Sequence, residues 1–183
     1  MRVPPSLIES CTAASAALSK YSNSMESSSK DHLKPFAHAA SNRCFGCGAS
    51  NPTGMHLEFF IAPDNSVVSF PTVSDIFEGH PGCLHGGVIA TLLDEAMSKA
   101  VRTLGHAATT RKMEIDYRRP VPSGVEIRVE GRIVRSEQRT HWVEASILNA
   151  HGTVLAHGKG LFFQGLPKGK NTGQPHGSPA ADQ

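Results

Sequence analysis

The sequence predicts an α+β domain in which one long helix packs against an antiparallel sheet. One stretch, from about Gly87 to Leu104, has apolar residues at helical spacing. Two short strand-like segments precede it, and four longer segments with alternating apolar and polar residues follow it. Short turn-forming segments separate the strands, which favours hairpin connections. This order of elements is typical of an antiparallel sheet covered by a helix on one face.

The first two strands form a predicted hairpin before the helix. Residues 55–62 and 66–70 are the strand-like segments, and the turn-forming sequence Pro63-Asp64-Asn65 lies between them. Residues 71–84 contain several glycines and prolines, so we expect a loop there.

The helix is predicted by its apolar spacing, which alternates between three and four residues. This spacing produces one wide apolar face, suited to packing on a sheet. Gly105 is expected to end the helix. The apolar positions are Ile89, Leu92, Leu93, Ala96, Met97, Ala100, Val101 and Leu104.

After the helix, the hydrophobic period changes from helical to two, which predicts strands to the end of the domain. The alternating series begin near Lys112, and turn-forming residues separate one series from the next. The series lie in residues 112–118, 125–134, 141–147 and 153–163.

Length and composition limit the classes of protein to consider. With 183 residues, the chain fits one domain, expected over 41–164, with a disordered leader at 1–40 and a disordered tail at 165–183. A net charge of +2 and an aromatic content of 6% argue against nucleic acid as a partner. No apolar run approaches the ~20 residues that cross a bilayer, so we expect a soluble, cytoplasmic protein without a membrane partner.

The cysteines do not predict a metal site or a cofactor. Cys44 and Cys47 have the spacing of half a zinc site, but no second Cys-x-x-Cys pair exists, and the nearest histidine that follows is His56. Because the chain has no evident secretory signal, reduced thiols are the default expectation, without disulfides.

The start of the helix carries the chemical signal. His85 and the glycines Gly86 and Gly87 open an apolar helix, whose first backbone N–H groups have no partner within the helix. Together with the helix dipole, these groups can stabilise an oxygen that gains negative charge, as in acyl transfer. Asp94 is an acid embedded among apolar residues of the same helix, and we interpret it as a general base or a nucleophile.

The spacing of these groups predicts a dimer. Gly86 and Asp94 are eight residues apart, which is about 12 Å along a helix. A single carbonyl group does not reach both of them in one chain. Two helices related by a two-fold axis and running antiparallel bring Gly86 of one subunit opposite Asp94 of the other.

Three segments of the chain together carry a family resemblance. They are Cys44-Phe-Gly-Cys-Gly-Ala-Ser-Asn-Pro-Thr-Gly-Met, Gly79-His-Pro-Gly-Cys-Leu-His-Gly-Gly-Val-Ile-Ala-Thr-Leu-Leu-Asp-Glu-Ala and Tyr117-Arg-Arg-Pro-Val-Pro-Ser-Gly. With these segments the chain resembles hotdog-fold acyl-CoA thioesterases over about Cys44 to Gln164. The similarity is to the phenylacetate-pathway and hydroxybenzoyl-CoA branch, and particularly to its long-chain relatives. It implies a curved antiparallel sheet around the helix, a homodimer or homotetramer, and hydrolysis of a fatty or aromatic acyl-CoA in lipid metabolism.

The resemblance also implies roles for individual residues. The Gly86 amide, with Gly87, contacts the thioester oxygen, and His85 shapes the loop or contacts the substrate. The Thr110 hydroxyl holds the water or the carboxylate of Asp94. The contacts to the CoA side of the substrate are implied for Asp116, Arg118 and Arg139. One departure is Gly79, where some relatives have an Asn or Gln as a second donor.

Alternative interpretations remain open at this level. Asp94 can instead pair with Lys99 or Arg102 on an exposed helix edge, and Cys83 with His85 resembles a nucleophile and its base. Two other functions also fit a hotdog fold: a protein that binds acyl thioesters without cleaving them, and a dehydratase.

Overall fold

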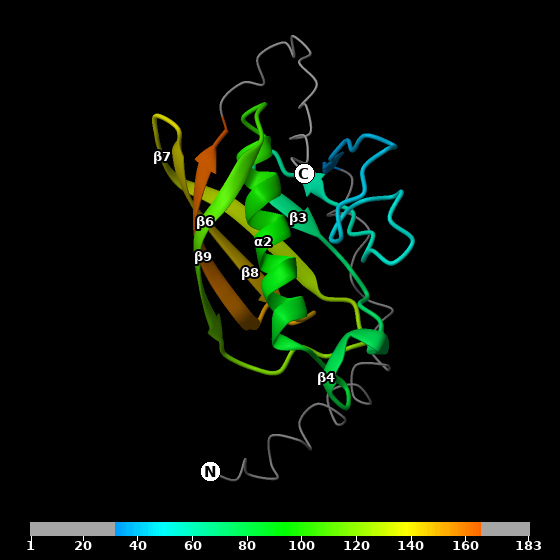
Figure 1. Cartoon of the computed structure of the whole chain (residues 1–183). Helices are drawn as coiled ribbons and strands as arrows, with labels where there is room; N and C mark the ends of the chain where they lie inside the picture. Colours follow the sequence, from blue (N-terminus) through cyan, green and yellow to red (C-terminus); the bar gives the residue numbers. More distant parts are fainter. Residues whose placement is uncertain (1–31, 166–183) are drawn as a thin grey trace, which may run out of the picture.

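The computed structural model describes residues 32–165, and the elements found there confirm the α+β architecture (Figure 1). A large antiparallel sheet curves around helix α2, and a two-stranded sheet and a short 3-10 helix lie before the helix. The elements are β1 (Lys34–Pro35), β2 (Phe60–Ile61), β3 (Val67–Ser69), η2 (Asp75–Phe77), β4 (Glu78–His80), β5 (Cys83–Leu84), α2 (Gly86–Arg102), β6 (Ala108–Tyr117), β7 (Arg128–Glu137), β8 (Thr140–Leu148) and β9 (Val154–Gln164).

The main sheet has the strand order β1-β2-β3-β7-β8-β9-β6, and every neighbouring pair is antiparallel. The long strands β7, β8 and β9 follow one another as hairpins, as the alternating series predict. Strand β6 pairs with β9 on one side and forms one edge of the sheet, and the two-residue strand β1 forms the other. An edge strand of ten residues leaves a row of backbone groups available for pairing with another chain.

The core lies between α2 and the concave face of the sheet. Residues of the predicted apolar helix face, among them Leu92, Leu93 and Met97, are fully buried there. The helix approaches β7 so closely that a Cβ atom on Gly131 would lie 2.5 Å from the Ala96 carbonyl oxygen. Glycine at this position therefore allows the helix backbone to lie directly on the sheet.

The helix prediction is confirmed with a small change at its end. The helix ends at Arg102, Thr103 is the C-cap residue, and Leu104 is already exposed. Gly105 has a φ of 85°, the left-handed conformation that makes glycine a helix terminator.

The first hairpin is confirmed as the pair β2 and β3, but its first strand is shorter than residues 55–62. The backbone N–H groups of Met55 and Leu57 bond instead to the carbonyl oxygens of Phe45 and Gly46, at 2.8 and 2.9 Å. Residues 55–59 therefore extend along the loop that carries Cys44 and Cys47 before the chain enters the sheet.

Other boundaries differ because strand pairing extends past the alternating series. Strand β6 begins at Ala108, opposite Gln164 of β9, rather than near Lys112. Strand β7 continues to Glu137, past the alternating residues 125–134. The short strands β4 and β5 and the helix η2 lie in the expected loop. Strand β1 lies within the region assigned to a leader, whereas residues 1–31 and 166–183 lie outside the described part. Within residues 32–165, no helix has the length and hydropathy of a membrane span.

Candidate active site

The N-terminus of α2 is capped by the side chain of His85. Its Nδ1 accepts a hydrogen bond from the Gly87 N–H at 3.0 Å, and the residue has the extended backbone of an N-cap. Gly86 is the first residue of the helix, and its N–H donates to no group within residues 32–165. His85 therefore caps the helix through the Gly87 N–H, and the Gly86 N–H has no acceptor in the described part of the chain.

Tyr117, at the end of β6, holds the same turn. Its hydroxyl donates to the Gly86 carbonyl oxygen at 3.1 Å. Its ring lies close enough to Gly86 that a Cβ atom added there would be 3.7 Å from the nearest ring carbon. In the sequence, Tyr117 belongs to one of the three segments that carry the family resemblance. The contact between Tyr117 and Gly86 links residues 31 positions apart, so local spacing does not reveal it.

Asp94 lies on α2 where the helix faces β6. The Thr110 hydroxyl donates to Asp94 Oδ1 at 2.7 Å, and both side chains are half-buried. Burial raises the pKa of Asp94 above its ordinary value, while the Thr110 hydrogen bond opposes that rise and the neighbouring Glu95 charge adds to it. Asp94 makes no ion pair within the described part of the chain, and Lys99 pairs with Glu95 instead.

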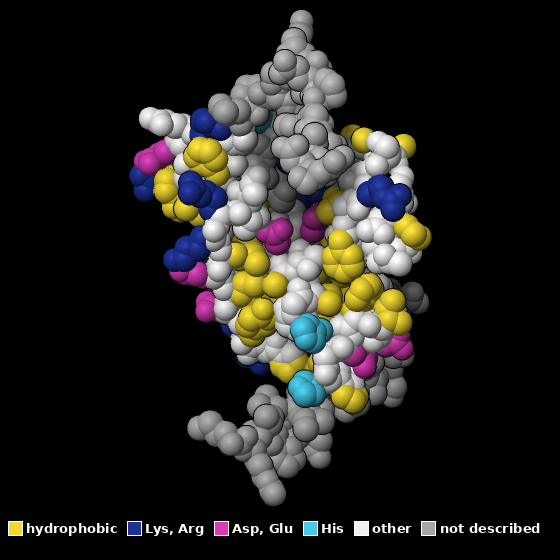
Figure 2. All heavy atoms as spheres, in the orientation of Figure 1, with side chains coloured by type: hydrophobic (Ala, Val, Ile, Leu, Met, Phe, Trp, Pro, Cys, Tyr) yellow, Lys and Arg dark blue, Asp and Glu magenta, His cyan; other side chains and the backbone are white. Residues whose placement is uncertain are grey.

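The structure therefore brings Asp94 to Thr110 and Tyr117 to Gly86, but it keeps these two pairs apart in one subunit. Both Gly86 and Asp94 are on α2, about 12 Å apart along its axis. Figure 2 shows apolar side chains gathered on the face that carries α2, with acidic side chains beside them.

The residues with an implied CoA role do not form one cluster in the subunit. Arg118 Nη2 lies 3.8 Å from Asp116 Oδ2, and both exposed side chains lie at the Tyr117 end of β6. The Arg139 guanidinium donates to the Gln164 carbonyl oxygen at 2.8 Å and lies over the ring of Phe163. Because Gln164 pairs with Ala108 at the other end of β6, roughly 30 Å of strand separates Arg118 from Arg139.

Two other positions of the loop before α2 are explained by their contacts. A Cβ atom on Gly79 would lie 3.0 Å from the Cα of His85, so a donor side chain there would press on the helix cap. Cys83 is disulfide-bonded, which corrects the expectation that all thiols are reduced. Its sulfur is therefore not a free nucleophile for His85 to activate.

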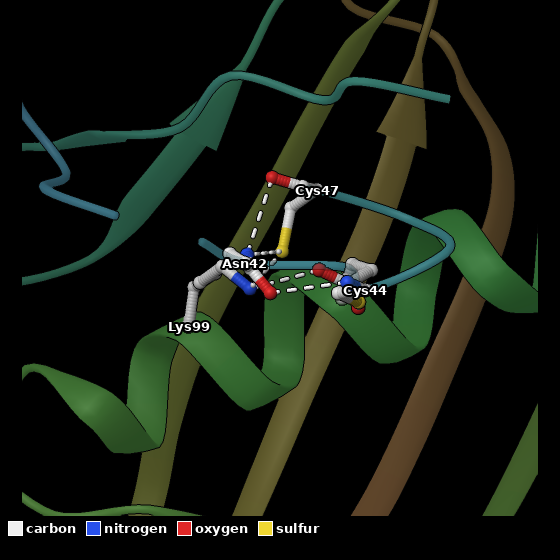
Figure 3. Close-up of polar contacts among 5 residues, drawn as sticks. Asn42, Cys44, Cys47 and Lys99 are labelled. Atoms are coloured by element: carbon white, nitrogen blue, oxygen red, sulfur yellow. Dashed lines mark hydrogen bonds and ion pairs between the residues drawn. The ribbon is translucent and has the colours of Figure 1, made fainter. Parts of the chain in front are cut away.

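A second group of polar residues lies on another face of α2, beneath the loop with the Cys-x-x-Cys sequence (Figure 3). We call it the thiol cluster, and it consists of Asn42, Cys44, Cys47, Glu95 and Lys99. The Lys99 ammonium contacts Glu95 Oε2 at 2.8 Å and Cys47 Sγ at 3.0 Å, and the Cys44 thiol donates to Glu95 Oε1 at 3.1 Å. Sequence reasoning missed this group because its members come from segments about 50 positions apart.

Burial and charge act in opposite directions within the thiol cluster. Burial alone raises the pKa of Glu95, but the Lys99 ammonium and the hydrogen bonds from Lys99, Cys47 and Cys44 together lower it below its ordinary value. Burial raises the pKa of the Cys47 thiol to about 11, although the Lys99 hydrogen bond opposes this rise. Lys99 is only 2% exposed, so its charge depends on Glu95.

Comparison with known proteins finds a family that part of the chain resembles. The family model described as Thioesterase superfamily matches residues 81–156, which include both ends of helix α2. Acyl-coenzyme A thioesterase THEM4 of Bos taurus is 28% identical over 123 residues, covering 65% of this chain and 51% of that protein. The Xenopus laevis protein of the same name is 29% identical over 80 residues, covering 44% and 36%. The chain thus spans about half or less of these curated relatives.

Solved structures agree on the fold. A thioesterase superfamily protein of known crystal structure is 22% identical, covers 89% of this chain and 81% of its own, and superposes with a TM-score of 0.64. A Streptococcus mutans protein crystallised with acetyl CoA is 25% identical, covers 55% and 82%, and has a TM-score of 0.53. Residues 81–156 thus match the family model, and the helix wrapped by an antiparallel sheet is the fold of the solved thioesterase superfamily proteins.

Proposed function

We propose that this protein is an acyl-CoA thioesterase that hydrolyses a fatty or aromatic acyl-CoA to the free acid and CoA. The observation that carries the proposal is Asp94, a half-buried carboxylate without a cation partner in the described chain, held by the Thr110 hydroxyl. A carboxylate in this environment suits proton transfer or nucleophilic attack rather than structural pairing. The names of the curated relatives support the same activity.

In the proposed reaction, the Gly86 amide and the helix dipole stabilise the negative charge that forms on the thioester oxygen. Asp94 either removes a proton from the attacking water or attacks the carbonyl carbon itself, forming an anhydride that water then hydrolyses. In both routes the carbon–sulfur bond breaks, CoA leaves as the thiolate and water supplies the oxygen of the acid.

The fold suggests how two subunits complete one site. Strand β6 is the long edge strand of the sheet, and Thr110 and Tyr117 near its two ends contact Asp94 and Gly86 respectively. If two β6 strands pair antiparallel so that Thr110 faces Tyr117 of the partner subunit, Asp94 of one chain comes opposite the Gly86 turn of the other. The free edge also becomes paired, which removes an aggregation hazard.

This dimer also accounts for the separation of the implied CoA contacts. Arg118 follows Tyr117 and Arg139 lies near the start of β6, so antiparallel pairing brings Arg118 of one subunit toward the Arg139 end of the other. The CoA moiety is therefore proposed to contact Arg118 and Asp116 of one chain and Arg139 of the other. A cytoplasmic location and a further assembly into tetramers remain predictions.

A heterodimer tests whether the site is shared. Gly86→Pro removes the N–H that is the proposed oxyanion donor. The helix should tolerate this change, because proline is favoured at the first helical position. The preceding residue, His85, already has the extended backbone that proline requires, with φ and ψ of −62° and 141°. Gly86→Ala is the matched control, since it keeps the N–H and its Cβ would lie 3.7 Å from the Tyr117 ring. Asp94→Asn removes the carboxylate.

We expect the Gly86→Pro and Asp94→Asn homodimers each to lose at least about a hundredfold of the CoA release measured with an acyl-CoA panel. A purified heterodimer of the two variants contains one site with both groups intact, so it should recover about half of the wild-type rate. An inactive heterodimer contradicts a shared site. A wild-type protein that binds acyl-CoA with micromolar affinity but releases no CoA would establish the non-catalytic alternative instead.

A further inference from the structure

The thiol cluster has the composition of a metal site, and the proposed thioesterase reaction does not use it. The Sγ atoms of Cys44 and Cys47 and a carboxylate oxygen of Glu95 all lie within 4.8 Å of one another. A turn closed by the Gly48 N–H on the Cys44 carbonyl oxygen, at 2.9 Å, places both thiols on the same side of the loop. Figure 3 shows this loop crossing over α2.

We propose that Cys44, Cys47 and Glu95 bind one Zn²⁺ ion that fastens the loop before β2 to helix α2. Two thiolates three positions apart in the Cys-x-x-Cys arrangement, with a third ligand from a different element, are a donor set that zinc accepts. The sequence lacked a second ligand pair. The fold supplies the third ligand from the helix, about 50 positions later in the chain.

The contacts around the three ligands match those that surround bound thiolates. Glu95 Oε2 accepts a hydrogen bond from Lys99, and Glu95 Oε1 points toward the Cys44 thiol. Oε1 is therefore available to a metal while Oε2 stays paired with Lys99. Cys47 Sγ faces two N–H donors, Lys99 Nζ at 3.0 Å and Asn42 Nδ2 at 3.5 Å. Donors of this kind stabilise a metal-bound thiolate and orient it.

The charges also balance. One Zn²⁺ ion and the Lys99 ammonium together offset two thiolates and the Glu95 carboxylate, so binding releases two thiol protons without leaving net charge in a buried site. Lys99 accordingly remains beside the ligands as a hydrogen-bond donor, and the ion lies on the side of Glu95 Oε1.

His38 lies near the thiol cluster but is not one of its three ligands. Its Nε2 atom is buried and has no hydrogen-bond partner in residues 32–165. The ligand atoms that lie within 4.8 Å of one another come from Cys44, Cys47 and Glu95, so the proposal rests on these three residues.

Metal binding to the full-length, reduced protein tests the proposal without reference to activity. Zinc content after dialysis and the absorption spectrum of the Co²⁺-substituted protein are measured for wild type and for Cys44→Ser, Cys47→Ser and Glu95→Gln. Matched controls are Glu58→Gln, an exposed acid, and His56→Ala, whose exposed ring contacts Asn51 outside the cluster.

We expect about one Zn²⁺ ion per wild-type chain and a thiolate-to-cobalt charge-transfer band after substitution. Each ligand variant should weaken zinc binding by at least about a hundredfold, and the two controls should bind as wild type does. A folded, reduced wild-type protein with no bound zinc and no charge-transfer band overturns the proposal, as does unchanged binding in Cys44→Ser. Because the wild-type spectrum alone decides, a variant that fails to fold does not remove the test.

Discussion

Asp94 and Glu95 are consecutive acids on one helix, yet their surroundings are opposite. Asp94 faces β6 and contacts the Thr110 hydroxyl, and burial raises the pKa of its carboxyl group. Glu95 faces the Cys-x-x-Cys loop, where Lys99 and the two thiols outweigh its burial and lower the pKa. The difference arises because successive helical residues point about 100° apart. One position along the chain thus separates a proposed reactive acid from a structural one.

The largest expected effect compares the two acids in catalysis. Asp94→Asn should lower kcat for acyl-CoA hydrolysis by about 10² to 10⁴-fold, because it removes the proposed base or nucleophile. Glu95→Gln should leave kcat of the folded protein within about tenfold, since Glu95 does not face Thr110. CoA release at saturating substrate measures both, with folding checked by circular dichroism. Equal losses in the two variants would break the distinction between the faces.

The next effect concerns the stability of the Glu95 face. Lys99→Met leaves Glu95 as a buried carboxylate without its cation, and we expect a loss of about 3–5 kcal/mol in the free energy of unfolding. The double variant Lys99→Met with Glu95→Gln should recover most of this loss, because no unpaired charge remains. Denaturant titration in the presence of a chelator measures both values without a contribution from bound metal. A double variant as unstable as the single one would argue that packing, not charge, matters there.

A smaller effect is expected in the pH dependence of the Asp94 face. Thr110→Val removes the hydrogen bond that lowers the pKa of Asp94, so that pKa should rise further. If the carboxylate is the active form, the acidic limb of the kcat/KM profile moves to higher pH relative to wild type. Thr109→Val, which alters an exposed threonine on the same strand, should leave the limb in place. A limb that does not move in Thr110→Val contradicts the role of Thr110.

The smallest effect is a stability change of opposite sign for the two acids. Burial raises the pKa of Asp94, so protonation stabilises the folded state at acidic pH, and this stabilisation is lost as pH rises through the raised pKa. Asp94→Asn should therefore gain about 1 kcal/mol at pH 7 and nothing at strongly acidic pH. Glu95→Gln should lose stability at pH 7, because the pKa of Glu95 is lowered in the fold. Thermal unfolding at both pH values tests the signs.

Much of the fold followed from local pattern. The apolar spacing predicted helix α2 to within two residues at its end, and the alternating series predicted the four long strands in order. Residues 55–59 were misassigned as strand because their amides bond to the Cys-x-x-Cys loop, a partner outside the alternating pattern. The strand β1 and the short pair β4 and β5 carry too few residues for a period to be visible.

The sequence alone determined the architecture, the helix start with Gly86, and the position of Asp94 in an apolar helix face, because these depend on residues a few positions apart. The resemblance then suggested Thr110, and the fold places its hydroxyl on Asp94. Only the tertiary structure decided that Tyr117 holds the Gly86 turn, that Lys99 pairs with Glu95, and that two thiols lie against the same carboxylate. These contacts join segments far apart in the chain, so they depend on how the loops and strands pack rather than on any local period.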